Sequence, residues 1–166
     1  MTEIAIQFVL GADWSSRFIA WYGQGYGGYS HVDAVLADGS LIGARSDRIG
    51  GVSPGVQHRP ANYARWKRRT LVTFPHTEGA YPGWVSWLDR QIGAGYDKGD
   101  ILGFVLGVSL MQEGHWICSA LQDAALEQTQ LLPPTPIPPQ QITPNSLYLM
   151  CIAAGATSKE LPVTPI

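Results

Sequence analysis

The sequence predicts an α+β domain in which a small antiparallel sheet or barrel packs against helices. Strand patterns and an Asp-Gly hairpin fill the first half of the chain, and helical periodicity dominates from about residue 78 onward. The chain has 166 residues, 45% of them apolar, which is enough to build one sizeable core. No repeat or domain boundary is visible, so we expect a single domain over residues 1–156 and a flexible tail over 157–166.

The predicted strands come first in chain order. Residues 4–10 form an apolar run typical of a strand, and residues 29–36 and 41–45 flank the Asp38-Gly39 turn as a hairpin. A proline-broken segment at 52–59 favours a short edge strand. Residues 65–74 predict a further strand, whose basic start at Lys67–Arg69 we interpret as an exposed strand edge and not as a binding patch.

The predicted helices follow a different period. A short helix is expected at about 16–22, a longer one at 78–92, and an apolar helix or turn at 98–108. Another begins near Ile117, and Thr143 with Pro144 predicts the start of a last helix that Gly155 ends. Five prolines between residues 132 and 141 indicate an extended surface segment.

Composition and charge exclude several classes of function. The formal net charge of −2 gives no reason to expect a nucleic-acid partner. Cys118 and Cys151 are the only cysteines, and they predict neither a disulfide framework nor a metal site. The start of the chain lacks the features of a signal peptide, and the apolar run 101–110 is too short to cross a bilayer. We therefore expect a cytoplasmic monomer without cofactor or metal, with export by a non-classical route left open.

Cys118 lies in the first turn of the helix predicted from Ile117. Unpaired N–H groups and the helix dipole favour a negative charge there, so a thiol at this position can have a lowered pKa and act as a nucleophile. A buried cysteine that only fills space is the simpler alternative. On this helix Gln122, Asp123 and Glu127 are expected to face solvent.

A nucleophilic cysteine needs a base that is held rigidly. His31 is the only histidine on a confidently predicted strand, whereas His58, His76 and His115 fall in broken or loop segments. Strand alternation places Asp33 on the same face as His31. The sequence therefore predicts Cys118 as nucleophile and His31 as base, with Asp33 or His58 as candidates to orient the imidazole.

These segments resemble a known family when taken in order. The stretch Ser30–Val35 with its Asp-Gly hairpin resembles the histidine hairpin of circularly permuted NlpC-type papain-like cysteine hydrolases. Gly95-Tyr96-Asp97 and Trp116–Ser119 are similar to the nucleophile region of that family, and Ile142–Leu147 to its closing segment. The similarity spans about residues 5–155, and in both cases the histidine hairpin precedes the cysteine helix.

The resemblance implies a permuted papain-like fold and hydrolysis of an amide or ester, or acyl transfer, through a thioester. The implied substrates are small peptides, peptidoglycan stem-peptide amides, or acyl and lipid groups. The backbone N–H of Cys118 and a group from the 11–14 turn would hold the oxyanion. Trp14, Tyr29 and Trp116 are the expected substrate-contacting side chains.

Two positions depart from the family pattern. The polar third residue that relatives often carry on the neighbouring strand corresponds to Gly43, and the Glu that often follows Cys-Ser is Ala120. Two alternatives stay open, the first because of these departures and the second because of the proline segment at 132–141. One is an inactive binding module on the same fold, with a peptide or lipid groove, and the other is an assembly component of a phage or secretion machine.

Overall fold

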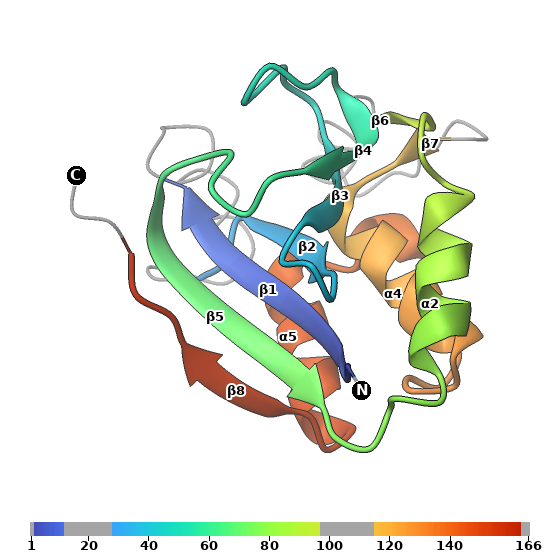
Figure 1. Cartoon of the computed structure of the whole chain (residues 1–166). Coiled ribbons are helices and arrows are strands. Elements are labelled where there is room, and N and C mark those ends of the chain that lie inside the picture. Colours follow the sequence, from blue (N-terminus) through green and yellow to red (C-terminus); the bar gives the residue numbers. More distant parts are fainter. Residues whose placement is uncertain (1, 12–27, 97–114, 164–166) are drawn as a thin grey trace.

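The computed structural model describes residues 2–11, 28–96 and 115–163, and its elements are shown in Figure 1. The strands of the main sheet are β1 (Ile4–Gly11), β2 (His31–Val35), β3 (Leu41–Arg45), β4 (Gly55–Arg59), β5 (Trp66–Phe74) and β8 (Thr157–Glu160). The helices are α2 (Tyr81–Asp89), α4 (Cys118–Gln128), α5 (Pro144–Ala153) and the short 3-10 helix η1 (Pro139–Gln141). Two short strands, β6 (Gly95–Tyr96) and β7 (His115–Trp116), pair in parallel just before α4.

The six-stranded sheet has the order β4-β3-β2-β1-β5-β8, and every neighbouring pair is antiparallel. The predicted hairpin is confirmed as β2 and β3, with Gly39 in the left-handed conformation (φ 82°) that its turn requires. The edge position predicted for the 52–59 segment is also confirmed within the six-stranded sheet, where β4 is the terminal strand and pairs with β3. On its other side, Val56 exchanges backbone hydrogen bonds with Gly93 and Ala94. The α+β class and the antiparallel sheet are therefore as expected.

Helices α4 and α5 lie against one face of the sheet, and α2 packs beside α4 (Figure 1). Alternate residues of β1, such as Ile4, Ile6 and Phe8, are fully buried in the core beneath them. Thr143 caps α5 through a reciprocal capping box with Ser146, and Gly155 (φ 91°) follows its end, as the sequence indicated.

The predicted wet face of α4 was wrong. Gln122 is fully buried, where its Nε2 donates to the carbonyl of Ile42 on β3 at 3.0 Å, and Asp123 is 2% exposed. The helix is covered on two sides, by the sheet and by α5, so residues on either side are buried whatever their polarity. A single-face periodicity could not show this second covering layer.

Two expectations about the sheet edge are met in part. β5 lies between β1 and β8, but β8 pairs only with Thr70–Thr73, so the exposed Lys67 and Arg68 lie at an edge as expected. The partly buried Arg69 differs, because it donates to Gln7 Oε1 at 3.0 Å. The tail expected from residue 157 is ordered over its first four residues, which form β8 against Thr70–Thr73. The expected helices at 16–22 and 98–108 lie outside the described residues.

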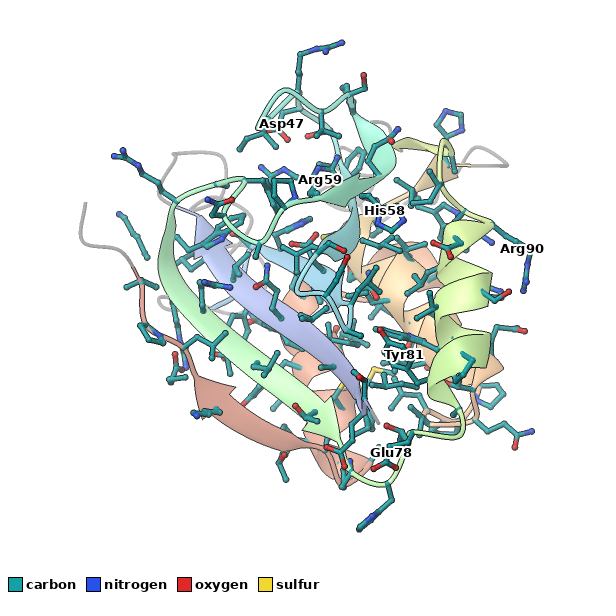
Figure 2. The ribbon with its side chains drawn as sticks, in the orientation of Figure 1. Asp47, His58, Arg59, Glu78, Tyr81 and Arg90 are labelled. Atoms are coloured by element: carbon teal, nitrogen blue, oxygen red, sulfur yellow. The ribbon has the colours of Figure 1, made fainter. Side chains whose placement is uncertain are left out.

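Helix α2 is tied to the sheet by side chains at both of its ends. Tyr81 extends toward the β2–β3 hairpin, where its hydroxyl oxygen accepts the N–H of Ala37 at 2.7 Å (Figure 2). At the other end of α2, the partly exposed side chains of Asp89 and of His58 on β4 pair at 3.3 Å. None of the described helices combines the length and the apolar content that a bilayer crossing would need.

Candidate active site

The structure brings Cys118 and His31 together, as the sequence predicted. Cys118 is the first residue of α4, after an extended N-cap at Ile117, and His31 is the first residue of β2. Each is only 6% exposed, and the thiol and the imidazole are hydrogen-bonded. Two segments separated by more than half of the chain therefore form one thiol–imidazole pair.

Asp33 orients the imidazole from the same strand. His31 Nε2 lies 2.7 Å from Asp33 Oδ1, which leaves Nδ1 as the ring nitrogen available to Cys118. An acceptor on one ring nitrogen fixes the tautomer and the plane of the ring. The structure thus places Asp33, and not His58, beside His31. The exposed side chain of His58 on β4 (Figure 2) pairs with Asp89 instead.

The Asp33 carboxylate is itself held by two further donors. Tyr63 donates its hydroxyl to Oδ2 at 2.9 Å, and Gln7 donates Nε2 to the same oxygen at 3.2 Å. Asp33 is fully buried, and burial works to raise its pKa, but the charge of His31 and these three hydrogen bonds hold the pKa below its ordinary value. The carboxylate is therefore charged at neutral pH and cannot easily turn away from the imidazole.

Electrostatics favour a thiolate–imidazolium pair. Burial opposes the charged form of His31, but the Asp33 carboxylate and the Cys118 thiolate outweigh it and raise the His31 pKa to about 9. Burial likewise opposes the thiolate of Cys118, yet the His31 charge, the hydrogen bond from His31 and one from the backbone of Val32 bring the pKa of Cys118 below its ordinary value. Over the pH range between these two pKa values the pair carries both charges.

The backbone around the pair leaves room for this arrangement. Pairing between β2 and β3 includes only Ala34 with Ile42 and Val35 with Leu41, so the ladder stops before Asp33. A Cβ atom on Gly43, the next residue along β3, would overlap Asp33 Oδ1. Only glycine at position 43 leaves the carboxylate its place.

The N-terminus of α4 presents a backbone N–H donor at Cys118. The first bond of the helix runs from the N–H of Leu121 to the carbonyl of Ile117, so the N–H of Cys118 has no acceptor within the helix. The N–H of Gly11 is already committed to Ser30 Oγ at 3.0 Å. Residues 12–14, from which a second donor was expected, lie outside the described residues.

The three expected substrate-contacting residues have different outcomes. Trp14 lies outside the described residues. Tyr29 is 4% exposed and packs in the core between Phe8 and Tyr148, with its hydroxyl donating to Thr70, so its contact with a substrate stays a prediction. Trp116 is partly buried against Trp87 and donates its indole N–H to Gln91 at 3.2 Å.

His115 also differs from its expected place in a loop. It lies in β7, where its ring packs so closely on Gly95 that a Cβ there would overlap the ring. Although His115 lies only three residues before Cys118 in the sequence, its ring packs on Gly95, which agrees with His31 as the base.

The sequence did not reveal Gln7 and Tyr63, the two residues that hold Asp33. Gln7 is the one polar residue in the apolar run of the first strand and pairs with Asp33 in the register, so its position in that run is a sequence signal for the site. Tyr63 lies in a turn after Pro60, and nothing in its sequence context points toward the site.

No protein-family model matches the chain, and no curated protein sequence matches it.

Proposed function

We propose that the protein is a cysteine hydrolase or acyl transferase that acts on an amide or ester carbonyl through a thioester on Cys118. The observation that supports this most is the buried Cys118–His31–Asp33 arrangement at the start of α4, with the Asp33 carboxylate 2.7 Å from His31. A cysteine that merely fills the core needs no oriented imidazole and has a raised pKa, as Cys151 does.

The reaction follows from the arrangement of these groups. The Cys118 thiolate attacks the carbonyl carbon, a C–S bond forms, and the electron pair of the C=O bond moves to oxygen. The N–H of Cys118 donates to this oxyanion. As the intermediate collapses, the bond to the amine or alkoxide breaks and the leaving group takes a proton from the His31 imidazolium.

The second half of the reaction returns the enzyme to its starting state. His31, now neutral, accepts a proton from water as the oxygen attacks the thioester carbonyl. The C–S bond breaks, the carboxylic acid leaves, and the thiolate–imidazolium pair is restored. An amine or alcohol in the place of water would make the same site an acyl transferase.

The substrate class is an extension of this proposal. The order of the histidine hairpin and the cysteine helix resembles permuted NlpC-type papain-like hydrolases, which favours small peptide amides, including those of peptidoglycan stems, or acyl esters as substrates. The same resemblance supports a permuted papain-like fold for the antiparallel sheet and its helices.

Acyl-enzyme trapping tests the proposal directly. We expect intact-protein mass spectrometry with p-nitrophenyl acetate to show one acetyl group on Cys118, and a library of peptide amides and acyl esters to give turnover. Both signals should be lost in Cys118→Ala and retained in Cys151→Ser, which is the matched control. Turnover by Cys118→Ala at the wild-type rate would overturn the assignment.

A further inference from the structure

A small hollow of about 210 Å³ lies where β5 begins. Its walls comprise Asn62, Arg65, Trp66, Arg69, Val163 and two alanines. No acidic side chain is among these residues, which combine two arginines and an asparagine with apolar side chains. The volume is below the roughly 300–1,000 Å³ typical of ligand pockets, so it suits one residue-sized group.

A β-bulge builds this hollow. Leu10 pairs with Arg68 whereas Gly11 pairs with Trp66, so β5 carries one extra residue at this point. The bulge places Trp66 in the cluster that contains Val9, on the face to which Arg69 also belongs through its pairing with Val9. Without the bulge, strand alternation would send Trp66 and Arg69 to opposite faces.

Two residues that line the hollow have a buried donor without an acceptor among the described residues. Trp66 is 6% exposed, yet its indole N–H has no acceptor in the described part of the chain, and the same is true of the buried Nε of Arg69. No carboxylate of the described residues pairs with Arg65 or Arg69. An anion bound in the hollow would accept from the guanidinium groups of the two arginines that line it and would balance their positive charge.

Two contacts connect the hollow to the candidate active site. The Trp66 ring lies nearly parallel to the His31 ring, with centroids 6.3 Å apart and 14° between the planes. Gln7 accepts from Arg69 through Oε1 and donates to Asp33 through Nε2. Trp66 therefore lies between the hollow and the imidazole, whereas the second route runs from Arg69 through Gln7 and Asp33 to His31.

We propose that this hollow binds a carboxylate group, and that it does so as a subsite for the substrate of Cys118. A planar carboxylate can accept from a guanidinium fork, and a small apolar group beside it would lie against the indole and the alanines. The subsite role rests on the proposed function, whereas binding of a carboxylate does not. A substrate with a free carboxylate close to its scissile bond is the class that fits.

The indole N–H of Trp66 gives a direct measurement of binding. Its NMR resonance, assigned with Trp66→Phe, is followed while the Cys118→Ala protein is titrated with N-acetyl-L-alanine or with its neutral amide. We expect a saturable shift with the carboxylate and none with the amide. Inorganic phosphate as a competitor distinguishes a site for any oxyanion from one that selects carboxylate.

Three charge-removing substitutions on neighbouring residues then locate the site. Arg65→Gln and Arg69→Gln should each weaken binding about 10-fold or more, the effect of losing a hydrogen bond to a charged group. Lys67→Gln removes the same charge from an exposed position outside the hollow and should leave binding unchanged. Equal binding of acid and amide, equal losses in all three variants, or no binding at 50-fold molar excess or more would each overturn the carboxylate site.

Kinetics test the subsite role separately. With any peptide amide that the wild-type protein hydrolyses, Arg65→Gln should raise KM for the free-carboxylate form and not for its carboxamide counterpart. Carboxylate binding without any turnover would leave the site in place and remove the hydrolase function. Turnover with no preference for a carboxylate would keep the hydrolase and remove the subsite role.

Discussion

Asp33 occupies the space that a side chain at position 43 would need. The two residues lie next to each other across β2 and β3, where the ladder between the strands has ended, and Asp33 Oδ1 fills the volume of a Gly43 Cβ. We infer that the group that orients His31 comes from the same strand as the histidine, and that this arrangement requires glycine at position 43.

Gly43→Ala should therefore disturb the site from a position that carries no functional group. The added methyl must displace the Asp33 carboxylate, which would cost about 1–3 kcal/mol of unfolding free energy as overpacking does. It would also loosen the hydrogen bond that orients His31. We expect chemical denaturation to show the loss of stability, and alkylation of Cys118 at pH 7 to slow in the folded variant.

Gly83→Ala is the matched control for this substitution. Gly83 lies in α2 with nothing near its Cβ position, and alanine favours a helix by about 0.5–1 kcal/mol over glycine. Stability should be equal or higher and alkylation unchanged. If Gly43→Ala behaved in the same way as Gly83→Ala, the proposed exclusion between position 43 and Asp33 would be wrong.

The pKa values of Cys118 and His31 predict that alkylation of the thiol and hydrolysis depend on pH in different ways. Because the pKa of Cys118 is lowered, iodoacetamide should label Cys118 at neutral pH, while Cys151, whose pKa burial raises to about 12, stays unlabelled in the folded protein. As pH rises through about 9, His31 loses its proton. The thiolate persists, so alkylation continues, but no imidazolium remains to protonate the leaving group, and hydrolysis should fall.

The pH dependences of alkylation and of hydrolysis together test for the thiolate–imidazolium pair. Rates of alkylation by mass spectrometry and kcat/KM for a hydrolysed substrate are compared between pH 5 and 10. A plateau of alkylation with a decline of kcat/KM above about pH 9 is expected. Labelling of Cys118 that follows the same titration as a thiol in the unfolded chain would contradict the ion pair.

Tyr63 should act as a positioning residue through Asp33. Tyr63→Phe removes the hydroxyl that donates to Oδ2 at 2.9 Å and leaves a buried carboxylate with one donor fewer, at a cost of about 1–3 kcal/mol. The pKa of Asp33 should rise, and the acidic limb of kcat/KM should move to higher pH. Such a shift would not follow from a loss of stability alone.

Tyr148→Phe provides the comparison for this change. Its hydroxyl makes a 3.2 Å bond to Ser158 at an exposed position, so its removal should change stability by only a few tenths of a kcal/mol and leave the pH profile unaltered. Identical profiles for Tyr63→Phe and the wild-type protein would show that Asp33 does not depend on the Tyr63 hydroxyl.

The contrast between Gln122 and His31 shows how far the sequence could predict this molecule. Local patterns were sufficient for the hairpin, the last helix with its Thr143 cap, and the start of α4 at Cys118, because each depends on nearby residues. They also placed His31 and Asp33 on one face of a strand. Other features depend on contacts between distant segments, which no local periodicity encodes. These features are the burial of Gln122 and Asp123, the pairing of β8, and the two residues that bond to Asp33 from β1 and from the β4–β5 connection.

Asp123 provides the last prediction, since it is a buried acid that the proposed mechanism does not use. Burial, with a further contribution from the charge of Glu127, raises its pKa to about 6, and its Oδ1 has no donor among the described residues. The folded state therefore favours the protonated acid. Its contribution to stability is fully present below the unfolded pKa of roughly 4 and is lost as pH rises through about 6.

Asp123→Asn keeps the shape of the side chain and removes the charge, so it should raise the thermal midpoint at pH 7.5. The difference from the wild-type protein should shrink as the pH falls toward 4, where Asp123 is uncharged in the folded protein. The exposed Asp89 is the control, and Asp89→Asn should show no gain at pH 7.5. If the increase in thermal midpoint for Asp123→Asn were the same from pH 4 to 7.5, it would come from packing. Ionisation of the buried Asp123 carboxyl would make this increase depend on pH.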